Sequence, residues 1–188
     1  GADSLFIVTR SASQGTRAGV AAALGIGVGC FIHVLAGALG LSAMLAASAS
    51  AFTFIKLLGA AYLVFMGVAL LRSRPAQQAP VAAVAIAPLR AIFAQGFLTN
   101  VLNPKVALFF LAFVPQFIDP AAPSKALSFV FLGAIFTFVG ALWCLFLVWL
   151  AVRVGSRATG SRISVWFSRG VGAIFVFLGV RLALAERG

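Results

Sequence analysis

The residues with the clearest chemical potential lie close together inside an apolar segment. Two amides, a proline and an ammonium group occur there as Asn100, Asn103, Pro104 and Lys105. Because an Asn-Pro step disfavours continuous helix, we expect a helix to pause at Asn103 and to restart with Pro104 in its first turn. Non-helical backbone inside a bilayer survives only beside protein or a water-filled cavity. Since a lysine there costs about 3 kcal/mol or more, the group indicates a polar pathway.

Two other ionisable residues could act with this group. Asp3, one of three acids, could be a functional carboxylate beside a broken helix or only a helix cap. His33, the one histidine, lies about 22 Å along a helix that starts at Ala18, near the middle of a bilayer. It could bind or relay a proton, or be neutral and hydrogen-bonded to another helix. Cys30 lies one turn away, but two ligands make a weak metal site, so we expect no metal and no cofactor.

The composition indicates a membrane protein. The chain has 188 residues, of which 63% are hydrophobic and 9% charged, and its mean hydropathy is +1.14, more than a soluble domain could bury. The net charge of +11 comes from basic residues in gaps between apolar runs, which favours topology signals over a nucleic-acid surface. Both cysteines fall in apolar segments, so no disulfide is expected. No hydrolase or nucleotide-binding motif occurs, so we expect no enzyme.

Apolar runs long enough to span a bilayer predict an all-α, multi-pass membrane protein. The arginine-rich gaps should face the cytoplasm. Residues 1–9 are too few to span, so we expect the chain to begin within or just after a first helix that is largely absent and that would complete six spans. The five predicted segments are 18–47, 51–71, 91–118, 126–152 and 165–185.

The two halves of the sequence resemble one another. We predict a first membrane repeat over 1–71, a cytoplasmic linker rich in alanine and proline over 72–90, and a second repeat over 91–188. Residues 56–62 match 169–175 at a constant offset, and the glycines at 67 and 179 match after a slip of one residue. Three spans per repeat would give the second copy the opposite orientation, which is typical of secondary transporters with a site between the repeats.

Two further expectations concern how the helices meet. Gly25, Gly29, His33 and Gly37 recur every four residues, so their shared face should let another helix approach closely. In the repeat alignment Asp3 and Lys105 would occupy equivalent places. They would neutralise each other or the two ends of a zwitterion.

Several motifs together resemble the LysE/RhtB family of amino-acid exporters over nearly the whole chain. The most specific is the Gly96-Phe-Leu-Thr-Asn-Val-Leu-Asn-Pro-Lys run with its aromatic continuation, supported by Gly1-Ala2-Asp3, Ser13-Gln14-Gly15 and Gly59-Ala-Ala-Tyr62. The resemblance implies six helices in the cytoplasmic membrane and outward export of amino acids or close derivatives, driven by the proton motive force. It also implies a Pro-Gly-Pro motif before the aspartate, where this chain has alanine in the second proline's place.

The sequence therefore predicts a secondary transporter whose partners are a small-molecule substrate and the bilayer, not nucleic acid. Its pathway would comprise Asp3, His33, Asn100, Asn103, Pro104 and Lys105. Two alternatives remain open: a passive channel of the same fold, and a membrane scaffold whose polar residues only join helices. The substrate also stays open, and exposed glycine faces leave room for a homodimer.

Overall fold

The computed structural model describes residues 2–47, 49–72, 85–119, 121–154 and 162–184. Within these ranges the ordered elements are helices and no strand occurs, which confirms the predicted all-α class. Residues 73–84, most of the predicted linker, lie outside the described residues. The elements are α1 (Ala2–Ala47), α2 (Ala49–Leu71), α3 (Leu89–Val101), α4 (Pro104–Phe113), the 3₁₀ helix η1 (Val114–Phe117), α5 (Lys125–Val154) and α6 (Arg162–Leu184).

The predicted apolar segments coincide with these helices, because a chain with so few polar side chains must satisfy its backbone groups internally. By length and composition, two helical stretches of the described chain could cross a membrane, Ala2–Gly40 and Lys125–Arg153. The pair Leu89–Val101 and Pro104–Phe117 adds a third if it counts as one broken span. Helices α2 and α6 contribute shorter apolar stretches. The total of six spans stays a prediction.

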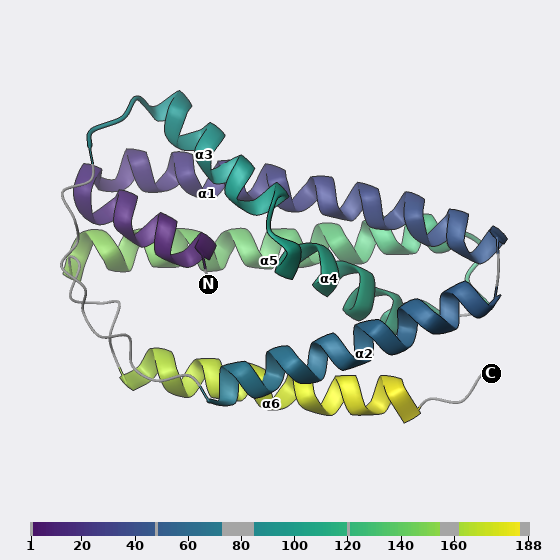
Figure 1. Ribbon diagram of the computed structural model, residues 1–188. Helices are drawn as coiled ribbons and strands as arrows, with labels where there is room; N and C mark the ends of the chain where they lie inside the picture. The colour runs from purple at the N-terminus through teal and green to yellow at the C-terminus, as the bar shows by residue number, and fades with distance from the viewer. Residues whose placement is uncertain (1, 48, 73–84, 120, 155–161, 185–188) are drawn as a thin grey trace. The chain divides into compact units, whose positions relative to one another are not determined.

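Helix α1 is a hairpin of two arms. Gly15 has φ 79° and ψ −172°, a backbone region that is essentially restricted to glycine. It separates a short arm, residues 2–14, from a long arm, residues 16–47, which fold back on one another (Figure 1). Ile7 and Ala22 share one buried cluster, although a straight helix would separate them by about 22 Å. A Cβ placed on Gly19 would fall on the Ser11 hydroxyl, so the arms are in contact.

The chain folds into two compact units, and each unit combines segments from both halves of the sequence. The first unit comprises Gly1–Ile32, Pro75–Asn103 and Ala134–Ser161, and the second comprises His33–Arg74, Pro104–Gly133 and Arg162–Gly188. The proposed repeats over 1–71 and 91–188 stay a prediction. Each unit is therefore described by itself.

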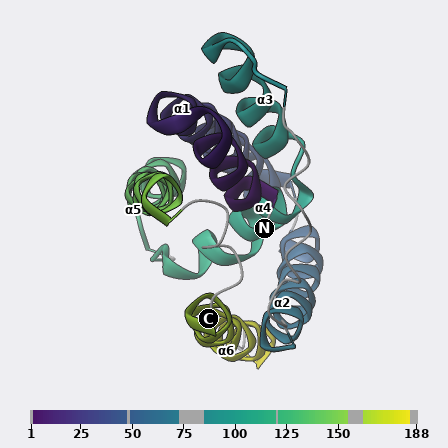
Figure 2. The ribbon, with the colours of Figure 1, turned by 90° about the vertical axis from the view of Figure 1, so that its left-hand side faces the viewer.

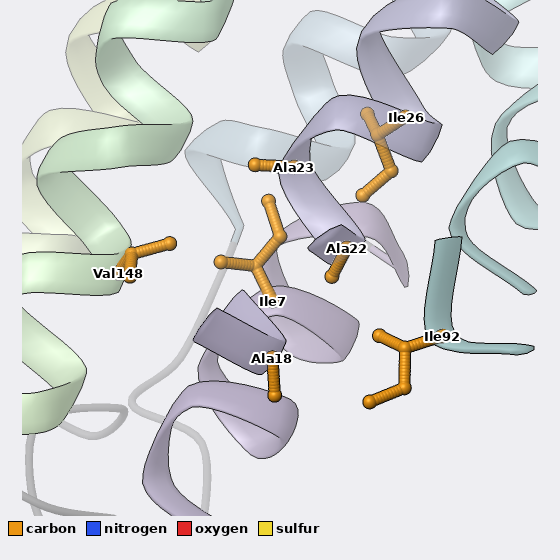
Figure 3. Close-up of a cluster of buried hydrophobic side chains, with 7 residues drawn as sticks. All are labelled: Ile7, Ala18, Ala22, Ala23, Ile26, Ile92 and Val148. Atoms are coloured by element: carbon orange, nitrogen blue, oxygen red, sulfur yellow. The ribbon is translucent and has the colours of Figure 1, made fainter. Parts of the chain in front are cut away.

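The core of the first unit forms where both arms of α1 meet α3 and α5. Ile7 of the short arm is fully buried against small residues of the long arm, and Ile92 of α3 and Val148 of α5 close the cluster. Small side chains on the long arm allow the larger aliphatic groups to pack between the helices. Figure 3 shows the seven members of this cluster: Ile7, Ala18, Ala22, Ala23, Ile26, Ile92 and Val148.

Glycines bring α1 and α3 into backbone contact in the first unit. A Cβ on Gly25 would collide with the Phe93 carbonyl oxygen, and a Cβ on Gly29 would lie 2.9 Å from the Cβ of Asn100. From the other side, a Cβ on Gly96 would lie 2.7 Å from the Ala22 carbonyl oxygen. These contacts confirm the close helix approach that was predicted for the glycine stripe.

In the second unit α2 and α6 pack against each other along a glycine seam, and Figure 2 shows them side by side. A Cβ on Gly67 would lie 2.6 Å from the Gly172 carbonyl oxygen, and a Cβ on Gly179 would lie 2.8 Å from the Ala60 carbonyl oxygen. Since the residue numbers rise along one helix and fall along the other, the two helices are antiparallel.

Aromatic rings fill the rest of the second unit. Phe110 and Phe129 are 1% and 0% exposed, and their ring centroids lie 6.5 Å apart. Phe109 stacks on Phe113 of the next turn at 4.6 Å and on Phe175 of α6 at 5.7 Å. These rings pack α4 between α5 and α6 and thereby anchor the helix that begins at the Asn-Pro step.

Candidate functional site

The helix break lies where the sequence predicts it. Helix α3 ends at Val101 and α4 begins at Pro104, whose missing N–H is harmless in a first turn. The Leu102 N–H donates to the Leu98 carbonyl at 3.0 Å, and the Asn103 N–H donates to the Asn100 carbonyl at 2.9 Å. The last turn of α3 thus tightens before the chain restarts.

Asp3 joins this break from the start of α1. The Nδ2 of Asn100 donates to Asp3 Oδ2 at 2.8 Å, and the Nδ2 of Asn103 donates to Asp3 Oδ1 at 3.5 Å. The first bond is short and the second is at the limit of a hydrogen bond. Asn100 is 2% exposed and Asp3 is half-buried. One carboxylate therefore accepts from the amides on both sides of the turn, across 97 and 100 positions of sequence.

The other three predicted pathway residues belong to the second unit. His33 is half-buried in the long arm of α1, Pro104 is the first residue of α4, and Lys105 is half-buried in its first turn. The structure thus brings together Asp3, Asn100 and Asn103 in the first unit. A common pathway that also includes His33 and Lys105 stays a prediction, as does the pairing of Asp3 with Lys105.

A second polar cluster surrounds Arg10, which the sequence pattern assigned to topology alone. Arg10 is only 9% exposed. Its Nη1 donates to Gln14 Oε1 at 3.0 Å and to the Ala85 carbonyl at 3.1 Å, and its Nη2 donates to Gln95 Oε1 at 2.8 Å. The guanidinium also lies over the Phe6 ring, with Cζ 5.7 Å from the centroid. Arg10 is therefore a component of the core as well as a charge.

Gln14 connects the same cluster to the start of α3. Its Nε2 donates to the Ala87 carbonyl at 3.0 Å, and its Oε1 accepts from the Ala87 N–H at 3.3 Å. The short arm of α1 and α3 are therefore joined at one end by Arg10 and Gln14 and at the other by Asp3. Sequence reasoning missed this cluster. The available signal was the Arg10 and Gln14 pair on one helix face, with Gln95 inside an apolar segment.

The two cysteines are free thiols, as predicted. Thr137 of α5 donates its hydroxyl to Cys30 Sγ at 3.5 Å within the first unit. Among the residues that the structure describes, no group of three or more His, Cys, Asp and Glu side chains could hold a metal ion.

The chemistry of the Asp3 site follows from its donor and acceptor set. A carboxylate that accepts hydrogen bonds from two neutral amides can still accept one from a cationic donor such as an ammonium group. The arrangement can recognise a cationic group.

Comparisons with known proteins place the chain in a family. The family model described as LysE type translocator matches residues 1–186. A membrane protein of Pseudomonas aeruginosa is 36% identical, covering 98% of this chain and 88% of its own length. The leucine efflux protein of Salmonella typhimurium is 27% identical over 99% of this chain and 88% of its own. The homoserine/homoserine lactone efflux protein of the same organism is 29% identical over 99% and 89%.

No solved structure matches the chain significantly. The family model covers nearly every residue, and its description is that of a translocator, as expected for a chain without enzyme motifs. The chain therefore belongs to the LysE type translocator family.

Proposed function

We propose that this protein exports amino acids or close derivatives across the cytoplasmic membrane, as a multi-pass secondary transporter. The observation that carries the proposal is the Asp3 carboxylate held by Asn100 and Asn103 at a helix break. A charged group and interrupted backbone inside an apolar protein are costly, and such features mark substrate pathways. The names of the leucine and homoserine relatives support an amino acid as substrate.

Each pathway residue has a chemical role in this proposal. Asp3 binds the substrate ammonium group or a proton, and Lys105 binds the substrate carboxylate. Asn100 and Asn103 hold Asp3 and offer amide contacts, while Pro104 maintains the break. His33 takes up or relays the proton that couples transport to the proton motive force.

We also propose that the two halves of the chain form an inverted repeat, and the contacts between α2 and α6 support this. In the sequence alignment of the halves, Gly67 corresponds to Gly179, and residues 59–60 correspond to 172–173. If each residue is replaced by its equivalent in the other half, Gly67 becomes Gly179 and Gly172 becomes residue 59. The contact of Gly67 with Gly172 therefore predicts a contact of Gly179 with residue 59 or 60. The contact of Gly179 with Ala60 agrees with this exchange within one residue. Such exchange is expected if a two-fold axis passes between antiparallel helices.

The first test measures efflux of preloaded, labelled amino acids from cells that express the complete gene, with and without an uncoupler. Selective efflux that an uncoupler abolishes is the expected result. Flux that follows the substrate gradient and ignores the uncoupler would favour the passive channel. Efflux equal to that of vector cells for every compound would favour the scaffold.

Site variants connect this test to the geometry. Asp3→Asn and Lys105→Gln should each abolish selective efflux at normal expression. Asp119→Asn and Lys125→Gln remove the same charges outside the pathway, in the turn after η1 and at the start of α5, and should export normally. If both pathway variants export as well as these controls, the assignment of the pathway is wrong.

A further inference from the structure

The guanidinium of Arg10 is a buried cation whose three hydrogen-bond acceptors are all neutral. Gln14, Gln95 and the Ala85 carbonyl accept its bonds at 2.8–3.1 Å. Within the described residues no carboxylate lies within ion-pair distance of Arg10. The undescribed segments between α2 and α3 and between α5 and α6 contain no acid, and Glu186 lies outside the described residues. A buried charge is stable only when it is compensated, and among the described residues Arg10 has no counter-ion of the usual kind.

Arg10 also has N–H groups that donate to no described residue. A guanidinium has five N–H groups. Nη1 donates twice and Nη2 once, so the Nε–H and a second Nη2–H have no acceptor among the residues that the structure describes. Nε and Nη2 form one edge of the guanidinium, which is an edge that binds both oxygens of a carboxylate.

Arg10 itself is buried, but its cluster extends to the protein surface. Two of the residues that accept from Arg10, Ala85 and Gln95, are exposed, and Ile86 between Ala85 and the start of α3 is 89% exposed. The arginine-rich gaps that include Arg10 are predicted to face the cytoplasm, the side from which an exporter takes its substrate.

We propose that Arg10, positioned by Gln14 and Gln95, binds the carboxylate group of the exported amino acid as it enters from the cytoplasm. The inference rests on the proposed export function and adds to it a second substrate contact, about 10 Å along the short arm from Asp3. The substrate supplies a counter-ion that the described residues do not provide. Arg10 thereby selects for a free carboxylate.

The test uses the full chain in phosphatidylcholine vesicles, where no anionic lipid competes for the arginine. Efflux is measured as a function of internal concentration for L-leucine and L-homoserine, each against its amide, which keeps the ammonium group and side chain but has no carboxylate. Wild-type protein should show a KM for the acid about 10-fold to 100-fold below that for the amide, the factor expected for a charge-assisted contact. Arg10→Gln should remove this preference by raising the KM of the acid alone.

Three further variants separate recognition from folding. Arg17→Gln, at an exposed arginine at the start of the long arm just after Gly15, is the matched control and should leave both KM values unchanged. Arg10→Lys keeps the charge but loses the paired donors, so it should recover only part of the preference. Gln95→Glu gives Arg10 an internal carboxylate and should raise the KM of the acid, even if Arg10→Gln does not fold.

Four outcomes decide the matter. If Arg10→Gln lowers the maximal rate for acid and amide alike and Gln95→Glu leaves the preference intact, Arg10 only holds the helices together and the inference is wrong. If wild-type protein moves acid and amide with equal KM, the inference is wrong while export stands. If it moves none of the four compounds and the efflux panel in cells also finds no exported amino acid, the proposed function and this inference both fail. Loss of the preference in both Arg10→Gln and Gln95→Glu, with Arg17→Gln unchanged, supports the inference.

Discussion

Gly29 offers a direct test of whether helix packing positions the Asp3 site. Its backbone faces α3, and a Cβ there would lie 2.9 Å from Asn100 Cβ, 3.0 Å from the Phe97 carbonyl oxygen and 3.1 Å from Asn100 Oδ1. Gly27, two residues earlier on the same helix, has open space where a Cβ would be. Gly29→Ala and Gly27→Ala therefore add the same methyl group in the same helical turn. At Gly29 the methyl group meets α3, whereas at Gly27 it meets nothing.

The size of the effect follows from these distances. Ordinary contact begins at 3.4 Å, so α3 must yield by about 0.5 Å, and its backbone cannot rotate away as a flexible side chain would. A shift of that size would stretch the 2.8 Å bond from Asn100 to Asp3 to about 3.3 Å, past the usual range. Overpacking costs about 1–3 kcal/mol, whereas alanine gains about 1 kcal/mol over glycine in any helix. Because that gain is common to both variants, Gly29→Ala should be about 1–3 kcal/mol less stable than Gly27→Ala.

The assay is denaturant unfolding of both purified variants in detergent, followed by circular dichroism, together with efflux from cells. We expect Gly27→Ala to match or exceed wild-type stability and to export normally, and Gly29→Ala to lose both stability and export. If Gly29→Ala proves as stable as Gly27→Ala and exports as well, the close contact of α1 with α3 does not position Asn100. The packing argument would then be wrong.

Further substitutions test three separate features of the fold by the same unfolding assay. Gly15→Ala should cost about 1–3 kcal/mol through backbone strain alone, since a Cβ there meets nothing within 4 Å; an unchanged stability would mean that the hairpin of α1 does not need this conformation. Gly67→Ala and Gly179→Ala should destabilise by similar amounts, because both meet backbone across the α2 and α6 seam, and a large difference would argue against equivalent repeats. Phe110→Ala should cost about 3–5 kcal/mol because its ring is buried, whereas Phe138→Ala, at a position 65% exposed, should cost far less; equal costs would contradict the assigned core.

The helix break is a feature that the local sequence alone predicts. Asn103 and Pro104 interrupt the helix because proline lacks an N–H and restricts the residue before it, and neither effect depends on the rest of the protein. The prediction of a pause followed by a restart at Pro104 is confirmed for that reason. The apolar segments and the absence of a disulfide were predictable on similar grounds, from composition and from the position of each cysteine.

The role of Arg10, by contrast, could not be predicted from the local sequence. Charge patterning assigned it to topology, and only the packed structure reveals a buried guanidinium that joins the short arm of α1 to α3. Its acceptors lie 75 and 85 positions away in sequence, and such pairings depend on how helices pack. The glycine stripe is an intermediate case: its spacing predicted a close approach but did not identify α3 as the neighbour of Gly25 and Gly29.

The sequence by itself therefore determined the all-α class, the helical segments and the break before Pro104, because backbone sterics and apolar composition act within a few residues. Tertiary structure decided the rest of the first unit. Gly15 permits a reversal but does not require one, so the hairpin of α1 depends on the cluster around Ile7. The bond from Asn100 to Asp3 depends in turn on that hairpin, which brings distant polar groups together only after the apolar surfaces have packed.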